Sequence, residues 1–364
     1  MQNLFGNSYT GDDLRRMTGS MAQLAGVRLS ELLDGRARGM RVADVYTGSG
    51  FRFQVLLDRA LDIGTVEYAG RPLAWVHPAL GGPELYEPQG EGWARTFGGG
   101  LLTTCGLTFF GQPEKDGDEE LGLHGRISHQ RGEGIRVTEE WRGDEYVIEV
   151  EGQARQTMAM GENLLLARKL STHLGATSLT LTDRVRNDGY TDTPHMILYH
   201  CNFGFPVVSP HSELLASLED ARPRDEAAAR GFPGYARFDP PEPDYAEQVF
   251  FHKPCVDAQG YSQAAIVNRE LGFGAYVRYR AAELPCLAQW KMMGAGDYVC
   301  ALEPANQWET PRRVLREEGR LRYLSAGEEV EYHVELGVLP DTDAVAAFEA
   351  QLPVADPARR VDSI

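Results

Sequence analysis

The chain has 364 residues, of which 42% are hydrophobic and 24% charged, and this composition predicts a folded globular protein with a sizeable core. A formal net charge of −17 and an isoelectric point near 5.0 predict a surface that repels phosphate backbones and anionic lipid headgroups, so neither nucleic acid nor a membrane is an expected partner. Residues 1–10 are polar and no later stretch is long and apolar enough to cross a bilayer, so we expect a cytoplasmic protein.

The first predicted element is a short helix over residues 11–17, and strands with period-two alternation follow it. Tyr146, Ile148 and Val150 alternate along one such strand. Another strand covers residues 179–186, where apolar and polar side chains alternate, and it stops at the turn sequence Asn187-Asp188-Gly189.

The second half of the chain contains a long irregular segment, a further strand and a terminal helix. Residues 217–245 are rich in proline and charged residues, which predicts a surface loop, either a cover over a site or a variable insertion. Val330 to Leu336 alternate apolar and charged side chains, as in a strand with one solvated face. Asp341 can cap a helix that ends at Leu352.

Strands therefore dominate, and they do not alternate with helices as a doubly wound parallel sheet would require. No fixed-period repeat and no interdomain linker is evident, so we expect one all-β domain over residues 1–364, built as a large antiparallel β-sandwich with few peripheral helices. The five cysteines are scattered and never form a C-x-x-C pair, which predicts buried, reduced thiols.

Several motifs of nucleotide, hydrolase and metal chemistry are missing from the sequence. Gly98-Gly99-Gly100 is not followed by a Lys-Ser/Thr helix start, and neither G-x-G-x-x-G before a helix nor G-x-S-x-G occurs. His195 and His200 are five residues apart on one expected strand, which places them on opposite faces and argues against a metal held by both. We expect no cofactor and no metal site.

Two residues stand where a core strand meets a loop and could carry acid–base chemistry. His200 ends an apolar run that leads into a Gly/Pro turn, although from position alone a core histidine bonded to a carbonyl is slightly the commoner interpretation. Glu303 follows an apolar run and precedes a proline, so we expect a partly buried carboxylate whose pKa is raised towards the range useful in general acid–base catalysis.

Further candidate contacts lie in two other clusters. His124 and Arg126 flank Gly125, where the backbone can approach a ligand closely, although an exposed turn is the ordinary alternative. Trp290 could stack on a sugar or could be a core tryptophan, and Lys291 beside it is a candidate cation.

Taken in order, these fragments resemble an aldose 1-epimerase-like family, the branch of the galactose mutarotase-like proteins whose substrates are mostly unassigned. The resemblance covers nearly the whole chain and rests on Val55 to Gly64, Gly99 to Leu107, Leu123-His124-Gly125-Arg126, His200 to Pro206 and Leu302-Glu303-Pro304-Ala305-Asn306.

The resemblance implies a galactose mutarotase-like supersandwich fold and a role for each matching residue. His200 would be the acid and Glu303 the base, with His124 as a sugar contact and Asn306 as a further candidate contact. Two elements of the mutarotases are not matched: their Asn-Arg element is replaced by Thr103 to Leu107, and their Asp-His pair is not evident.

The nearest substitutes for the unmatched residues are a few charged side chains elsewhere. Arg126 or Arg59 could replace the missing arginine, and His252 the missing aspartate. Asp58, Arg59 and Asp62 could equally form a structural ion pair beside a turn, which is the favoured interpretation for Asp62.

The implied reaction interconverts the anomers of a monosaccharide by opening and closing the ring, with Glu303 ionised and His200 protonated. Two alternatives remain: another sugar epimerase or isomerase that uses the same pocket, and a non-catalytic carbohydrate-binding or regulatory module. A phosphorylated sugar ranks below a neutral or acidic one because only Arg59, Arg126 and Lys291 could meet the phosphate. The expected assembly is a monomer or homodimer.

Overall fold

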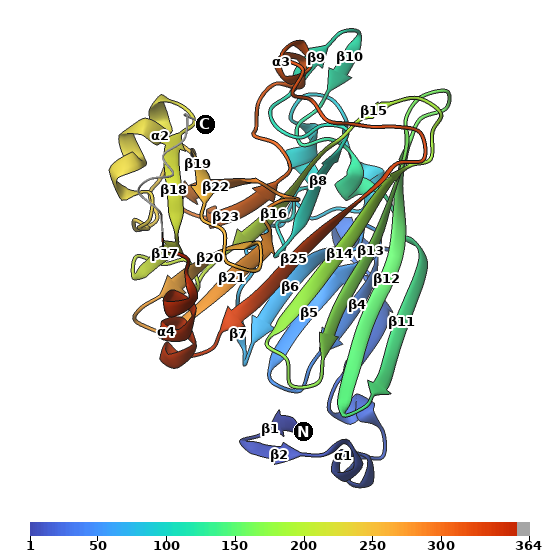
Figure 1. Cartoon of the computed structure of the whole chain (residues 1–364), viewed down its shortest axis with the longest axis vertical. Coiled ribbons are helices and arrows are strands. Elements are labelled where there is room, and N and C mark those ends of the chain that lie inside the picture. The colour runs from blue at the N-terminus through green and yellow to red at the C-terminus, as the bar shows by residue number, and fades with distance from the viewer. Residues whose placement is uncertain (355–364) are drawn as a thin grey trace.

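The computed structural model describes residues 1–354 and shows three large antiparallel sheets with a few helices at their edges (Figure 1). The prediction of an all-β antiparallel sandwich is therefore confirmed. The sheets have eight, six and five strands, and short two-stranded ribbons complete the fold within the described residues. One continuous cluster of buried apolar side chains includes residues of all three sheets, such as Val55, Leu166 and Leu302.

The eight-stranded sheet is the largest, and it runs in the order β11-β12-β13-β14-β25-β21-β20-β17. Its strands are β11 (Glu133–Arg142), β12 (Glu145–Thr157), β13 (Asn163–His173), β14 (Ser178–Asn187), β25 (Glu329–Leu339), β21 (Phe273–Arg280), β20 (Tyr261–Asn268) and β17 (Ser212–Ala216). The alternation predicted at residues 146–150, 179–186 and 330–336 is present. In β25, Val334 lies in the core opposite Leu181, whereas Glu331 points to solvent.

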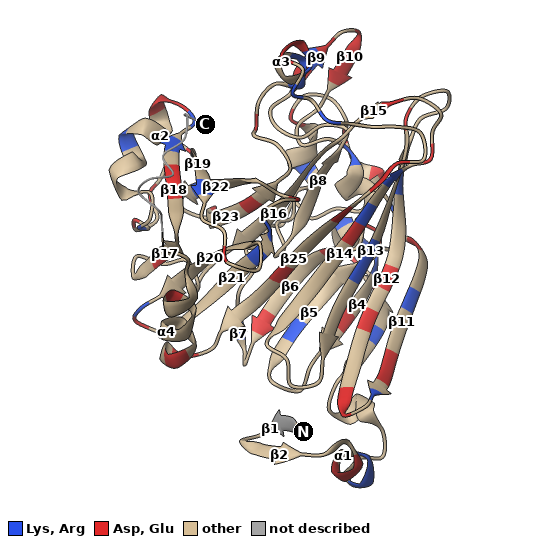
Figure 2. Ribbon diagram, in the orientation of Figure 1, with Lys and Arg blue, Asp and Glu red and all other residues tan. Residues whose placement is uncertain are grey.

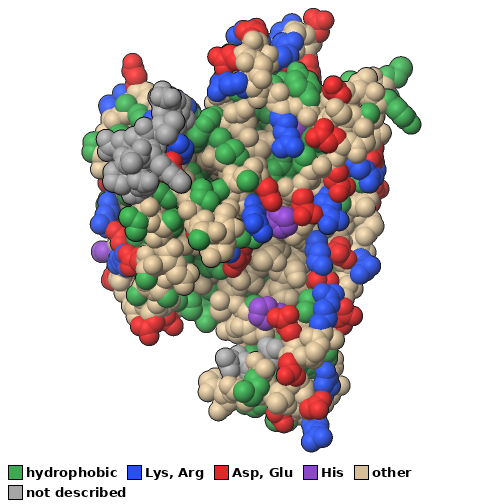
Figure 3. All heavy atoms as spheres, in the orientation of Figure 1, with side chains coloured by type: hydrophobic (Ala, Val, Ile, Leu, Met, Phe, Trp, Pro, Cys, Tyr) green, Lys and Arg blue, Asp and Glu red, His purple; other side chains and the backbone are tan. Residues whose placement is uncertain are grey.

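Charged side chains cover the solvent face of this sheet and pair across neighbouring strands (Figures 2 and 3). Arg142 and Lys169 both bind Glu149, and Arg184 of β14 binds Glu331 of β25 at 2.6 Å. Glu149 is buried beneath its two partners, whereas the Arg184–Glu331 pair is exposed, and exposed pairs of this kind contribute little to stability.

The five-stranded sheet packs against the same core, and the six-stranded sheet completes it. The five strands are β3 (Gly26–Glu31), β4 (Arg41–Tyr46), β5 (Phe51–Leu56), β6 (Asp62–Tyr68) and β7 (Arg71–Pro72). The six-stranded sheet runs in the order β18 (Leu218–Pro223), β19 (Gln248–Pro254), β22 (Cys286–Met293), β23 (Tyr298–Ala305), β16 (Met196–Phe203) and β8 (Thr103–Leu107).

A buried ionic cluster joins the sheets inside the core. Arg168 of β13 donates to Asp183 of β14 and to Asp62 of β6, and all three side chains are at most 2% exposed. Asp62 also accepts hydrogen bonds from Thr104 of β8, and the Tyr199 hydroxyl of β16 donates to Asp183. Asp62 thus lies in a structural ion pair, as favoured from the sequence, but with Arg168 as its partner.

The helices lie at the periphery, and two of the four in the described residues, α1 and α4, match the predicted ones. Helix α1 (Gly11–Met17) begins after a Thr10–Asp13 capping box, and α4 (Thr342–Gln351) is capped by Asp341, whose side chain accepts from the N–H of Ala344. The remaining elements are β1 (Gln2–Leu4), β2 (Asn7–Tyr9), β9 (Glu114–Asp116), β10 (Glu119–Leu121), β15 (Thr193–Pro194), β24 (Tyr323–Leu324), α2 (Glu226–Gly231), α3 (Arg312–Glu317) and short 3₁₀ turns η1 (Met21–Gln23), η2 (Gly35–Ala37), η3 (Pro83–Leu85), η4 (Gly92–Thr96), η5 (Ile127–His129) and η6 (Phe232–Gly234).

The prediction of an irregular loop over residues 217–245 is wrong for its first half. This half forms the edge strand β18 and the helix α2, because β18 ends at Pro223 and Asp225 then caps α2 through the N–H of Ala228. A proline is tolerated at the end of an edge strand, where its missing N–H breaks no further pairing.

All five cysteines are unpaired and buried, as predicted. Within the described residues, no helix is long and apolar enough to span a membrane.

Candidate active site

His200 and Glu303 face each other across two neighbouring strands of the six-stranded sheet. The register of β16 against β23 pairs Cys201 with Leu302 and Leu198 with Ala305, which sets His200 directly opposite Glu303 on the face turned away from the main core. His200 Nε2 lies 3.3 Å from Glu303 Oε1, and each residue is only 5% exposed. The two candidates chosen from the sequence are therefore brought together.

Burial shifts the pKa values of the two groups in opposite directions. Desolvation lowers the pKa of His200 to about 4 and raises the pKa of Glu303 well above its usual range, with the charge of Glu309 adding to the second effect. Both shifts favour the uncharged forms, so the unliganded pair holds its one proton on the carboxyl group. This differs from the expected ionised Glu303 and protonated His200, because the site excludes more water than strand-end positions suggested.

Aromatic rings enclose the imidazole of His200. Phe97 and Trp290 stand edge-on to it with ring centroids 5.4 Å away, and His124 does the same at 5.7 Å. Trp93 stacks on Phe97 and contacts His124. The site thus has the apolar, partly aromatic wall typical of small-molecule pockets, with few polar groups inside it.

His124 reaches the site from a tight turn. Its φ of +55° and that of Gly125 at +75° are left-handed, and a Cβ on Gly125 would lie 2.3 Å from the Phe109 carbonyl oxygen. Burial lowers the pKa of His124 to about 3, so its ring is neutral. Neither His124 Nδ1 nor His200 Nδ1 finds a hydrogen-bond partner in the part of the chain that the structure describes.

A cluster of charged residues, which the sequence reasoning missed, borders the pair. Arg224 donates to Glu247 at 2.8 Å, and Glu247 accepts in turn from Trp290 Nε1 at 2.9 Å. Glu309 lies 3.6 Å from Arg224, and the charges of Arg224 and Glu309 both act on the pKa of Glu303. The only sequence signal for Glu309 was its place just beyond the Leu-Glu-Pro motif, and Arg224 was hidden in the segment interpreted as a loop.

His252 and Lys291 do not face this site. Each is adjacent in its strand to a residue that does, Phe251 and Trp290, so period two turns both to the opposite face of the sheet. There His252 Nε2 is 2.9 Å from the Gln289 side-chain oxygen, and Lys291 Nζ is 3.3 Å from Asp239. Neither is placed to contact a substrate of the His200–Glu303 pair.

Arg59 and Asn306 are also engaged elsewhere. Arg59 is 2% exposed and donates to the Gly81 carbonyl beside His129, while burial lowers its pKa to about 10. Asn306 accepts from the Ile197 N–H at 2.9 Å and donates to the His195 carbonyl, which ties β16 to the chain beyond β23.

Arg126 is partly buried and caps the N-terminus of η5. Its backbone N–H donates to the Gly106 carbonyl at 2.9 Å. Desolvation raises the pKa of Tyr86, and the nearby charge of Arg126 opposes that shift. The Tyr86 hydroxyl donates to the carbonyl of Gly125, the residue between His124 and Arg126.

His195 lies just before β16, and its side chain is buried in the protein interior. Its Nδ1 is 3.1 Å from the Leu107 carbonyl oxygen, and its Nε2 is 2.7 Å from the Tyr332 hydroxyl. Within residues 1–354, no three His, Cys, Asp or Glu side chains are grouped so that they could hold a metal ion.

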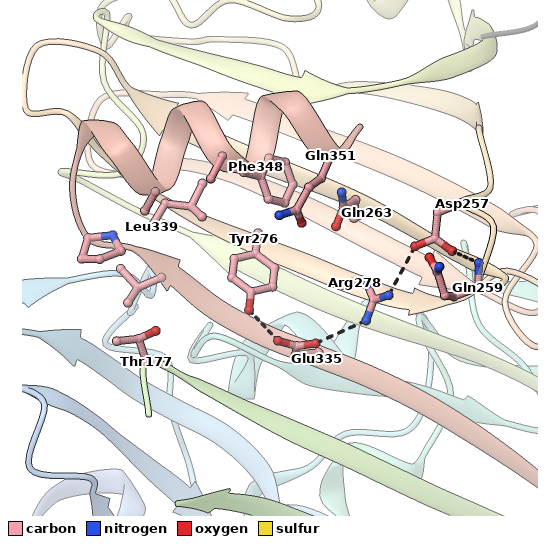
Figure 4. Close-up of a pocket in the computed structure, with 14 residues that line it drawn as sticks. Thr177, Asp257, Gln259, Gln263, Tyr276, Arg278, Glu335, Leu339, Phe348 and Gln351 are labelled. Atoms are coloured by element: carbon pink, nitrogen blue, oxygen red, sulfur yellow. Dashed lines mark hydrogen bonds and ion pairs between the residues drawn. The ribbon is translucent and has the colours of Figure 1, made fainter. Parts of the chain in front are cut away.

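A cavity of about 770 Å³ lies elsewhere, between α4 and the solvent face of the eight-stranded sheet (Figure 4). Its polar lining is largely paired within itself: Tyr276 donates to Glu335, and Arg278 binds both Glu335 and Asp257. These groups lie on the other large sheet, away from His200 and Glu303.

A broad antiparallel sandwich of this kind defines the galactose mutarotase-like class of folds, and three solved structures share it. A protein from Klebsiella pneumoniae subsp. pneumoniae MGH 78578, described as a "putative aldose 1-epimerase", aligns with a TM-score of 0.85 at 23% identity over 92% of this chain and 91% of that one. A galactose mutarotase-like protein from Clostridium acetobutylicum aligns with a TM-score of 0.60 at 14% identity over 87% of this chain and 99% of that one. Galactose 1-epimerase from Lactobacillus acidophilus NCFM aligns with a TM-score of 0.57 at 14% identity over the same shares.

The chain belongs to the family described as Domain of unknown function (DUF4432), whose model matches residues 37–338. No curated protein matches it. These three solved structures are all below 25% identical to this chain, so they establish the fold, and the chemistry must be argued from the residues of the site.

Proposed function

We propose that this protein interconverts the anomers of a monosaccharide, as an aldose 1-epimerase-like enzyme, with His200 and Glu303 as its catalytic residues. The observation that carries the proposal is the 3.3 Å approach of His200 Nε2 to Glu303 Oε1 in a buried, aromatic-lined site. The galactose mutarotase-like fold supports the same substrate class.

The reaction needs one proton donor and one proton acceptor at neighbouring oxygens. In ring opening, the acceptor takes the proton of the anomeric hydroxyl while the donor protonates the ring oxygen, so the bond between that oxygen and the anomeric carbon breaks. Rotation of the aldehyde and reversal of both transfers closes the ring as the other anomer. The reaction requires neither a metal nor a nucleotide.

The shared proton of the pair suits this exchange. With the proton on Glu303, the carboxyl group donates and the neutral imidazole accepts during ring opening. Ring closure then returns both protons, so each group acts once as acid and once as base, and the pair ends in its starting state. The roles of acid and base thus alternate within a cycle instead of belonging to one residue.

The aromatic wall supplies the remaining requirement. Trp290, fixed through its Nε1–H bond to Glu247, is partly exposed and offers an apolar ring to which the C–H face of a sugar can bind, while the buried Trp93 supports the wall by stacking on Phe97. They also keep bulk water from the pair, which strengthens its electrostatic interactions.

The direct test is the rate at which the protein relaxes freshly dissolved α-anomers of hexoses, pentoses and uronic acids, followed by polarimetry or NMR. We expect Glu303→Gln to lose on the order of 10²–10⁴-fold in turnover while sugar binding persists, because the amide has the same shape but cannot exchange the proton. His200→Ala should be comparably impaired. Glu331→Gln, on the solvent face of the other sheet, is the matched control and should retain full activity.

Other outcomes would redirect the proposal. Solvent deuterium entering a carbon position would identify an epimerase or isomerase that breaks a C–H bond. Sugar binding without any acceleration of mutarotation would identify a carbohydrate-binding module.

A further inference from the structure

A small cavity of about 170 Å³ opens beside the catalytic pair. Two chain segments, 109–114 and 309–311, form its walls together with Arg224. Its polar side chains include Arg224, Glu309 and Gln112. The cavity lies next to the site, because its wall residue Gly111 accepts a hydrogen bond from the His124 N–H at 3.0 Å, and the His124 ring lies 5.7 Å from that of His200.

The guanidinium of Arg224 makes two hydrogen bonds and one longer ion pair. Its Nε donates to Asp225 at 3.0 Å and its Nη2 to Glu247 at 2.8 Å. Its Nη1 is 3.6 Å from Glu309 Oε2, which is longer than a hydrogen bond. The side chains of Arg224 and Glu309 remain 22% and 15% exposed, so both can still meet a ligand.

We propose that Arg224 and Glu309, assisted by Gln112, bind hydroxyl groups of an uncharged sugar ring and determine which sugar epimer the site accepts. This inference rests on the proposed function for its choice of a sugar as ligand. Arg224, Glu309 and Gln112 would then bind the sugar hydroxyls. The sequence had suggested His252, Lys291 and Arg59 as sugar contacts, but these three residues face elsewhere.

Hydroxyl groups suit this pair better than anionic groups do. A carboxylate accepts and a guanidinium donates, so two adjacent hydroxyls can each bond to one of them with opposite polarity. Arg224 already has three carboxylates around it, Asp225, Glu247 and Glu309, and a sugar carboxylate or phosphate would be a fourth negative charge. Desolvation raises the pKa of Glu309, which indicates that water is scarce there, so an unpaired anion would be costly.

The cluster is also held in place from outside. Glu247 bonds to both Arg224 and Trp290, so the guanidinium and the aromatic wall are positioned as one unit. A sugar packed on Trp290 with its anomeric centre at His200 and Glu303 would therefore present its other hydroxyls to a preformed set of partners.

The test uses 1,5-anhydrohexitols with the gluco, galacto and manno configurations, which have no anomeric hydroxyl and cannot mutarotate. Calorimetric titration should show the wild-type protein preferring one configuration by about 10- to 100-fold, the range expected for one hydrogen bond to a charged group. Glu309→Gln should reduce that preference to less than about 3-fold, while Glu331→Gln should leave it unchanged. The methyl glycoside of a uronic acid should bind at least about 10-fold more weakly than its uncharged counterpart.

Gln112→Ala provides a second variant that keeps the fold, because Gln112 is an exposed residue. We expect Gln112→Ala to lose less of the preference than Glu309→Gln does.

Three results would each overturn the inference: undiminished selectivity in Glu309→Gln, tighter binding of the uronic acid glycoside, or no binding of any anhydrohexitol by the wild type. Selective binding that depends on Glu309, in a protein that fails to accelerate mutarotation, would uphold the inference and refute the proposed function.

Discussion

At the scale of single residues, one proton shared by His200 and Glu303 controls the chemistry. Burial lowers the pKa of the imidazole to about 4 and raises that of the carboxyl group, so both are uncharged at pH values between the two pKa values. Protonation of His200 would remove the proton acceptor, and deprotonation of Glu303 would remove the proton donor. The two groups titrate as a pair, so the observed limits belong to the pair.

We therefore predict a bell-shaped dependence of kcat/KM on pH with an acid limb near pH 4 and an alkaline limb set by Glu303. The acid limb lies below the usual histidine pKa because the enclosed site disfavours imidazolium. Polarimetry from about pH 3 to about pH 10, corrected for the buffer-catalysed rate, measures both limbs. An acid limb centred near 6.5 would show that His200 is solvated and would contradict the assignment.

At the scale of elements, the buried cluster around Arg168 connects the strands that carry the site to the rest of the sandwich. Asp62 and Asp183 neutralise Arg168, and Tyr199 and Thr104 extend the contacts to β16 and β8. Tyr199 lies on the reverse face of β16 from His200, so this cluster fixes the strand from behind. A well-bonded buried cluster is sensitive to the loss of any one member, whatever its net contribution to stability.

Arg168→Met should lower the free energy of unfolding by about 3–5 kcal/mol, because two buried carboxylates lose their compensating charge. Urea denaturation measures the change. Arg184→Met, which removes an exposed arginine from the neighbouring strand β14, should have a much smaller effect. Equal effects of the two substitutions would mean that the buried carboxylates find another way to be neutralised.

At the scale of the whole molecule, burial leaves many histidines unable to take up protons in the folded state. The pKa is lowered to about 2 for His129, to about 3 for His124 and His195, and to about 4 for His200 and His252. Desolvation is the largest cause in each case. The unfolded chain binds these protons near the usual pKa of 6.5, so acid favours the unfolded state.

The protein should therefore lose stability as the pH falls from about 6.5 towards 4, by up to about 1.4 kcal/mol per pH unit for each such histidine. Asp62 and Glu303, whose pKa values burial raises, act in the opposite sense and offset part of this loss. Urea unfolding at pH 7, 6 and 5 measures the net slope. A stability independent of pH over this range would show that these imidazoles are open to water.

The periodic features of this protein follow from its sequence. The alternation at Val330 to Leu336 and the cap at Asp341 are local patterns, and local patterns follow from the pleat of a strand or the turn of a helix. His200 and Glu303, expected where a strand meets a loop, lie inside β16 and β23, because both strands continue past them. Which side chains meet depends on the tertiary structure. Strand register turned Lys291 and His252 away from the site, and the fold of residues 218–231 brought Arg224 to Glu309, 85 positions later in the chain. Burial, which sets the protonation of the pair, depends on rings from three separate segments, at Phe97, His124 and Trp290, and so could not be predicted from any one of them.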